Sequence, residues 1–192
     1  HIRRTSPYGA ATNKASDIFV SQLAVAGFGG PANRRRFSGK SNNLARHRSM
    51  KMDNSEVIIC HGRKWKNQWD SFICNCPNAS IPHLSGWENI ITKTYGHRAI
   101  YLMYCREGRV LGVLPLVWLK GIVAGNILCS MPFLDGGGIC AASETGEKVL
   151  LSEAISLRDS YKAQLLELRH KKELAGSRGI LRRDKVDMIL DL

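Results

Sequence analysis

The sequence predicts an α/β fold in which helices flank a mixed β-sheet. Three observations support this class: helical and strand-like segments alternate from residue 51 onward, a hairpin signal stands among them, and a strand–helix–strand succession follows it. The composition agrees, because 44% of the 192 residues are hydrophobic and 23% are charged. This balance is typical of a globular domain and excludes collagen-like, coiled-coil and wholly disordered chains.

Two helices are predicted before the hairpin. The first has an apolar face at i, i+4, i+7 and i+8 and is ended by Pro77; its face consists of Trp65, Trp69, Phe72 and Ile73. The second begins at Ser85, because Ser85 and Glu88 have the spacing of a capping box. Gly96 supplies the left-handed residue that ends this helix. Its apolar face consists of Trp87, Ile90, Ile91 and Thr94.

A β-hairpin follows, with strands over residues 99–105 and 110–119 and a turn at Glu107-Gly108. Gly108 adopts a positive φ at no steric cost, which suits a tight turn. The second strand is apolar on both faces, so we expect it to be central and covered on both sides. Pro115 lies within it and predicts a bulge or a local loss of ladder hydrogen bonds.

The remaining segments predict a crossover unit. A third strand covers residues 127–131 and ends in the Pro- and Gly-rich stretch 132–138. An amphipathic helix is expected over residues 147–161, followed by strands over 165–169 and 186–192. A strand, a helix and a second strand in this order are typical of a sheet that contains a parallel pair.

Residues 1–50 differ from the rest of the chain. The first 49 residues carry nine Lys or Arg and one acidic residue, whereas the remainder carries nineteen and fifteen. This stretch shows no sustained apolar period, so we expect a disordered basic arm, or an extension that is not translated, ahead of a domain over residues 51–192. One alternative function is therefore nucleic-acid binding through the basic clusters 34–36 and 46–48.

Six cysteines are present, and none forms a C-x-x-C motif. The spacing matches no common zinc site, so we expect no metal and reduced, mostly buried thiols in a cytoplasmic protein. No transmembrane segment is expected either. The most apolar run, residues 110–134, contains Lys120 and is interrupted by glycines and prolines, which favours two buried strands over a membrane span.

The order of local motifs resembles the FemAB-related acyltransferases, which have a GNAT-like fold, and is closest to the branch associated with exopolysaccharide and exosortase loci. The motifs that carry the resemblance are WDSF (69–72), PNASIPHLSGW (77–87), YGHR (95–98), EGRVLGVLPL (107–116), MPFLDGG (131–137) and LELRH (166–170). It covers residues 65–192. The resemblance implies a GNAT-like mixed sheet, incomplete because this chain matches only the first of two tandem halves.

The resemblance also implies a function. Relatives transfer an acyl or aminoacyl group from acyl-CoA or aminoacyl-tRNA, as co-substrate, to an amine of a cell-envelope or exopolysaccharide-related precursor. No tightly bound cofactor is expected. The sequence contains no Q/R-x-x-G-x-G/A loop for a coenzyme A pyrophosphate, and the spacing of residues 136–138 departs from it. We expect the second half to lie beyond Leu192 and the chain alone to lack transferase activity, or to act as a non-catalytic docking module.

Seven residues are candidates for substrate binding. Phe133, Asp135, Gly136 and Gly137 follow a strand, where glycines let a ligand approach the backbone, although a turn that requires positive φ explains them equally well. Glu167 and Arg169 share one face of a strand and either contact a substrate or form a structural ion pair. Trp87 lines a groove or belongs to the core.

No catalytic residue is assigned. His83 and His97 have the chemistry of a general base, but a histidine near a helix terminus is more often a capping group.

Overall fold

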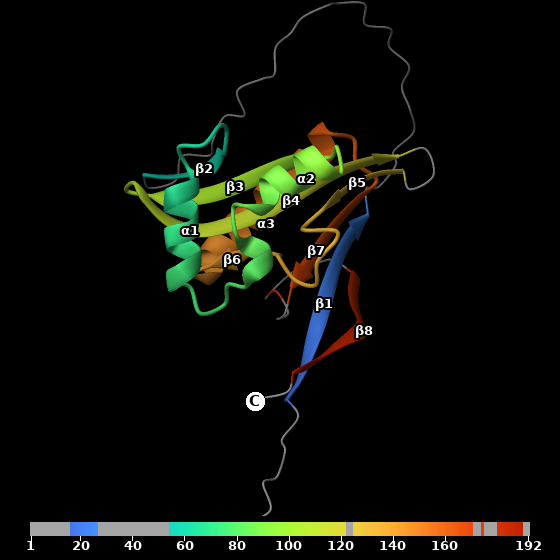
Figure 1. Cartoon of the computed structure of the whole chain (residues 1–192). Helices are drawn as coiled ribbons and strands as arrows, with labels where there is room; N and C mark the ends of the chain where they lie inside the picture. The colour runs from blue at the N-terminus through green and yellow to red at the C-terminus, as the bar shows by residue number, and fades with distance from the viewer. Residues whose placement is uncertain (1–15, 27–53, 122–124, 171–173, 175–179, 190–192) are drawn as a thin grey trace, which may run out of the picture.

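The structure is a computed structural model that describes residues 16–26, 54–121, 125–170, 174 and 180–189. A β-sheet separates two layers of helices (Figure 1): α1 (Lys66–Asn75) and α2 (Trp87–Thr94) lie in front of it, and α3 (Glu144–Ser160) lies behind it. A short 3₁₀ helix, η1 (Ile81–His83), joins the front helices. The predicted α/β class with a mixed sheet flanked by helices is confirmed.

The described strands form one eight-stranded sheet in the order β2-β3-β4-β5-β7-β1-β8, with β6 pairing beside β4. Their bounds are β1 Ser16–Ala26, β2 Ser55–Ile59, β3 Arg98–Arg106, β4 Arg109–Gly121, β5 Gly125–Cys129, β6 Cys140–Ala141, β7 Leu165–His170 and β8 Ile180–Ile189. Among these strands β5 and β7 form the one parallel pair, and α3 is the crossover between them. The other neighbours are antiparallel.

The predicted central strand is confirmed. Val113, Leu114, Leu116 and Val117 of β4 have no exposed surface. Because side chains alternate across a strand, Val113 joins the apolar cluster beneath α1, whereas Leu114 and Leu116 join the cluster beneath α3. Burial of both faces of β4 therefore ties the two helical layers together.

The hairpin turn is confirmed. Of the two alternatives for Pro115, the local loss of ladder hydrogen bonds is confirmed and the bulge is not. Glu107 and Gly108 both have positive φ, 51° and 74°. The register shifts between Tyr104 and Cys105, whereas Pro115 lies opposite Tyr101 in regular register. On its other edge β4 pairs with β6 up to Val113 and with β5 from Val117 onward. Pro115 falls in the interval between these partners, where a missing donor does not break the ladder.

The predicted capping box of α2 is wrong. Ser85 does not cap the helix: its backbone N–H and its Oγ donate to the two carboxylate oxygens of Asp70 on α1, at 2.9 and 2.7 Å. Gly86 occupies the N-cap position without a side-chain hydrogen bond, and Glu88 pairs with Lys66 at 2.6 Å. Asp70 is an acceptor for both Ser85 groups, so the segment between α1 and α2 is held by α1.

The later elements agree with the sequence apart from their ends. The helix begins at Glu144, three residues before the predicted start, because Ser143 accepts a hydrogen bond from the amide of Gly146 as N-cap. The strand predicted over 165–169 is β7, one residue longer. The last strand, β8, begins at Ile180 rather than at residue 186.

The expectation that residues 1–50 lack regular structure is wrong for Ser16–Ala26, which form β1 between β7 and β8. The pairing of β1 with β8 shifts register between Val20 and Gln22. The extra residue lies in β8, because Lys185 and Arg182 are three positions apart where Val20 and Gln22 are two positions apart. Residues 1–15 and 27–53 lie outside the described residues, as do the basic clusters on which the nucleic-acid alternative depends.

No helix in the described part of the chain is both long enough and apolar enough to cross a membrane.

Replacing Asp70 by Ala should lower the free energy of unfolding by about 1–3 kcal/mol, because the nearly buried Ser85 loses its acceptor. Asp70→Asn, which keeps one carbonyl oxygen, should cost less. The neighbouring Ser71→Ala, at an exposed position, is the matched control and should stay within about 0.5 kcal/mol. Urea denaturation measures all three, and equal effects for Asp70→Ala and Ser71→Ala would contradict this account of the α1–α2 segment.

Candidate functional site

The parallel strands β5 and β7 separate at Ser130. Cys129 and Glu167 are their last paired residues. The Ser130 amide donates to the Glu167 carbonyl at 2.9 Å, and the Arg169 amide donates to Ser130 Oγ at 2.8 Å. The Ser130 hydroxyl thus replaces a backbone carbonyl as acceptor where the β5–β7 ladder ends. At the next residue, Met131, φ is 43° and the chain changes direction. The carboxyl ends of a parallel pair are where ligands bind in open α/β sheets.

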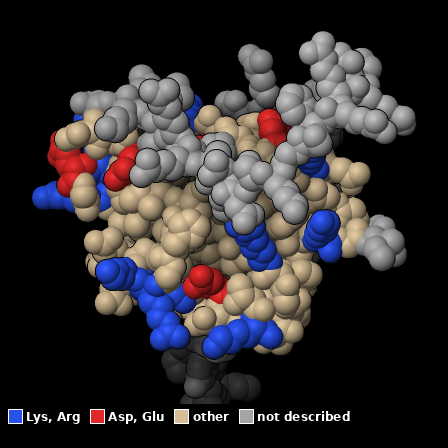
Figure 2. Space-filling model, turned by 90° about the horizontal axis from the view of Figure 1, so that it is seen from above, with Lys and Arg blue, Asp and Glu red and all other residues tan. Residues whose placement is uncertain are grey.

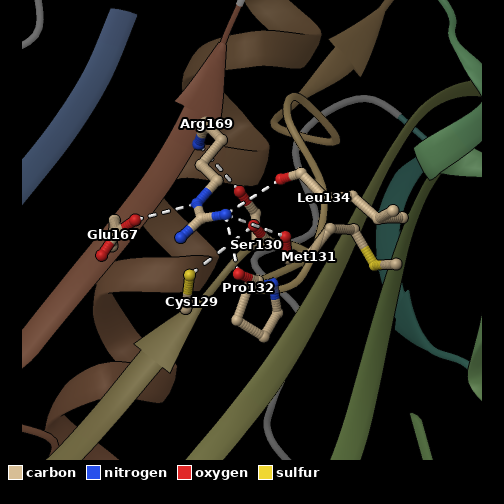
Figure 3. Close-up of polar contacts among 7 residues, drawn as sticks. All are labelled: Cys129, Ser130, Met131, Pro132, Leu134, Glu167 and Arg169. Atoms are coloured by element: carbon tan, nitrogen blue, oxygen red, sulfur yellow. Dashed lines mark hydrogen bonds and ion pairs between the residues drawn. The ribbon is translucent and has the colours of Figure 1, made fainter. Parts of the chain in front are cut away.

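Arg169 holds the segment that follows β5 (Figure 3). Its Nη1 donates to the carbonyl oxygens of Pro132 and Leu134 at 2.8 and 2.9 Å, and its Nε donates to Glu167 Oε1 at 2.9 Å. The Arg169 side chain is 15% exposed and that of Glu167 is 21% exposed. The structure therefore contains the ion pair that was one of the two sequence interpretations, and most of the guanidinium is engaged within the protein.

Two histidines hold one peptide group of the glycine-rich segment. The Gly138 carbonyl lies 3.0 Å from His83 Nε2, and the amide of Ile139, which belongs to the same peptide group, donates to His170 Nε2 at 2.8 Å. His83 and His170 are both buried. The Gly138 amide donates to the Arg169 carbonyl at 2.7 Å, so β7 and η1 together fix the path of the chain at this point.

These contacts assign opposite tautomers to the two imidazoles. The Ser80 amide donates to His83 Nδ1 at 3.1 Å, so the His83 proton is on Nε2 and is donated to Gly138. His170 accepts at Nε2, so its proton is on Nδ1. Burial, followed by the neighbouring His83, lowers the pKa of His170 to about 4, whereas a contact with the Leu168 backbone raises it less. His170 is therefore neutral at pH 7.

The sequence around His83 explains its position. Ser80 and His83 form a reciprocal capping arrangement at the start of η1, with Ser80 Oγ 3.0 Å from His83 Nδ1. The indole of Trp69 on α1 donates to the His83 carbonyl at 2.6 Å. The alternative that His83 is a capping group is confirmed. A capping box is present near the predicted place, but it belongs to Ser80 and His83.

The glycines after β5 are required by packing within the protein. Gly137 has a φ of +90°, and a Cβ there would lie 2.6 Å from Met131 Cγ. A Cβ on Gly138 would lie 2.7 Å from the His170 ring and 2.6 Å from the Arg169 carbonyl oxygen. The turn interpretation, with positive φ, therefore holds for Gly137, and Gly138 is needed for the close approach to β7.

A cavity of about 400 Å³ lies beside the clamped peptide group. Its walls come from the segment before and within η1, the glycine-rich segment, the first turns of α3 and the end of β7. They consist of Pro77, Asn78, Ala79, Ser80, His83, Gly137, Gly138, Ile139, Ala141, Glu147, Arg169, His170 and Leu174. Glu147 is the acidic side chain of this wall. Nε2 of His83 and Nε2 of His170 are each engaged with the Gly138–Ile139 peptide group. The geometry suits binding of a polar ligand with a positive group better than proton transfer by an imidazole.

Two of the seven predicted binding residues, Gly137 and Arg169, line this cavity. Glu167 contacts Arg169, and Gly136 is buried next to Gly137. The remaining three are not among its lining residues: they are Trp87, Phe133 and Asp135.

Phe133 belongs to an exposed aromatic stack instead. Its ring is 44% exposed and stacks on Tyr95 at a centroid distance of 4.1 Å, with His97 5.9 Å away on a nearly parallel plane. Trp87 is half-buried and donates from its indole to the Ile81 carbonyl at 3.0 Å. Asp135 is exposed.

Sequence reasoning missed Asn78, Ser80, Glu147 and His170 as cavity residues. A signal was present for His170, because it continues the period-two pattern of Leu166 and Leu168, both fully buried. Glu147 was assigned only as the start of a helix. Asn78 and Ser80 lie in a loop, where residue type alone does not indicate direction.

Charged groups of both signs lie on the face seen from above in Figure 2, where several blue and red groups adjoin each other and much of the remaining described surface is uncharged. Within the described residues, no group of three or more His, Cys, Asp or Glu side chains is placed to hold a metal ion.

Comparisons with protein-family models, with curated proteins and with solved structures find no match for this chain.

Replacing Arg169 by Met should lower the free energy of unfolding by about 1–3 kcal/mol, because the partly buried carbonyls of Pro132 and Leu134 lose a charged donor. Amide exchange should show the loss first at Leu134 and Gly138. Arg109→Met removes an exposed arginine from the hairpin and is the matched control, with a change within about 0.5 kcal/mol. Unchanged protection at Leu134 and Gly138 would contradict the role given to Arg169.

Stability should fall as the pH is lowered from 6.5 toward 4. The unfolded chain protonates His170 below its ordinary pKa of 6.5, whereas the folded protein does so only near pH 4. Within this window the free energy of unfolding falls by about 1.4 kcal/mol for each pH unit. Above pH 6.5 the contribution of His170 to stability is fully present. His170→Gln should flatten the profile, whereas His61→Gln, at an exposed histidine, should leave its slope unchanged. Parallel profiles for the wild type and His170→Gln, from chemical denaturation at each pH, would contradict this assignment.

Proposed function

We propose that this chain is the GNAT-like first half of a FemAB-related acyl or aminoacyl transferase and that it binds the amine-bearing acceptor. The element order supports this: a strand, two helices, three antiparallel strands, a crossover helix and a strand parallel to the last of them. The observation that carries the proposal is the cavity of about 400 Å³ beside the carboxyl end of β7 and the glycine-rich segment that follows β5.

The carboxylate of Glu147 favours an amine, because Arg169, the basic residue of the lining, is already paired with Glu167. Glu147 is half-buried in its wall, and the first turn of α3 positions it. A carboxylate at a partly desolvated site binds an ammonium group through charge-assisted hydrogen bonds. Ser80 and Asn78 add polar groups beside it, and Pro77, Ala79 and Ile139 supply apolar contacts. Such a mixed lining fits one end of a polar precursor, such as an amino sugar.

The described residues do not supply an evident general base. In acyl transfer the acceptor nitrogen attacks the carbonyl carbon of the donor, loses a proton and expels the tRNA hydroxyl or the coenzyme thiol. His83 and His170 each use Nε2 to hold the Gly138–Ile139 peptide group, and Glu167 pairs with Arg169. We therefore assign acceptor binding to this half and the chemistry to a second half, with acyl-CoA or aminoacyl-tRNA as donor.

Binding of an amine can be tested by nuclear magnetic resonance. Titration with glucosamine should shift the amide signals of Ser80, Gly138 and Glu147, and N-acetylglucosamine, which lacks the ammonium group, should bind at least tenfold more weakly. Glu147→Gln should remove this difference, whereas Glu153→Gln on the same helix should not. Equal binding of the two sugars, or shifts confined to other parts of the protein, would contradict an amine site.

The assignment of chemistry to a second half predicts that the purified chain has no turnover. The assay pairs charged tRNA and acyl-CoA donors with amine acceptors. Turnover that Glu167→Gln abolishes would show that this chain is a complete enzyme. It would contradict the assignment of the chemistry to a second half.

A further inference from the structure

Two cysteines that are 64 residues apart meet beside the cavity. Cys76 Sγ, just after α1, lies 3.0 Å from Cys140 Sγ on β6. Cys140 is 1% exposed, and Cys76 is half-buried. A disulfide bond is about 2.05 Å long, so the two sulfurs need to approach by about 1 Å to bond.

A shared metal ion fits this distance less well. Thiolates bind zinc at about 2.3 Å, and a tetrahedral site then places two sulfurs about 3.7 Å apart. The pair also has no third ligand of a metal-binding cluster among the described residues. The geometry is that of two thiols poised for a bond with each other.

We propose that Cys76 and Cys140 form a reversible disulfide by exchange with a small-molecule disulfide. The Cys76 thiolate attacks one sulfur of the small disulfide and releases one thiolate. Cys140 then attacks the Cys76 sulfur of the mixed disulfide and releases the second. The two protein thiols lose two electrons and two protons in total, and the small disulfide becomes two thiols.

The surroundings assign the order of the two steps. Cys76 is the more exposed thiol, so it meets the small disulfide first. Burial and the adjacent Cys76 sulfur raise the pKa of Cys140 well above its ordinary value. Cys140 is thus a poor nucleophile toward solvent and reacts once a partner sulfur is already next to it.

The bond would join two walls of the cavity. Pro77 follows Cys76, and Ile139 and Ala141 flank Cys140, and all three line the cavity. Oxidation therefore connects the segment before η1 to the strand that follows the clamped peptide group. This inference stands on the thiol geometry alone and does not depend on the proposed transferase function.

The test is a thiol count on the full chain before and after incubation with oxidised glutathione. The reduced protein has six thiols, and the oxidised protein should have four. Peptide mapping should find one linked pair that contains Cys76 and Cys140. The midpoint of thermal unfolding should rise by roughly 5–15 °C, because the bond closes a long loop.

Two variants make the result specific. Cys74→Ser replaces the exposed cysteine two positions before Cys76, and this variant should still lose two thiols. Cys76→Ser should form no internal bond. Six remaining thiols in the oxidised wild type, a linked pair other than Cys76 and Cys140, or loss of two thiols in Cys76→Ser would each overturn the proposal.

Discussion

The peptide group between Gly138 and Ile139 is the constraint on which the candidate site depends. His83 donates to its carbonyl and His170 accepts from its amide, while the Gly138 amide is bound to the Arg169 carbonyl. These contacts connect η1, the glycine-rich segment and β7 at one point. Both imidazoles are buried, so the hydrogen bonds are made in an environment where an unpaired partner is costly. These hydrogen bonds fix the position of a peptide group whose two residues, Gly138 and Ile139, line the cavity.

The same constraint limits the chemistry of the site. An imidazole whose two nitrogens hold the backbone is a structural group, and a histidine that stays neutral far below pH 7 is a poor proton acceptor. Arg169 is similarly engaged by the carbonyls of the segment after β5. Glu147 is the acidic group among the side chains that line the cavity. For this reason we interpret the site as one that binds and orients, with chemistry supplied from elsewhere.

Much of the fold could be predicted from the sequence because it depends on local periodicity. The apolar run of β4, the Glu107-Gly108 turn and the α3 crossover are all encoded within short segments. The predictions that failed involve partners distant in sequence. Ser85 donates to Asp70 and does not form a local cap, and β1 pairs with β7 across more than a hundred residues. The site was only partly predictable, because a glycine run indicates a tight path but not whether a ligand or a histidine lies against it.

The most direct test of this account is the tautomeric state of the two histidines, measured from the imidazole nitrogen signals by nuclear magnetic resonance. The account predicts that at pH 5.5 His83 carries its proton on Nε2, that His170 carries its proton on Nδ1, and that His170 is still neutral. Titration of His170 near pH 6.5, or the same tautomer in both rings, would show that they do not hold the peptide group and would contradict the central claim.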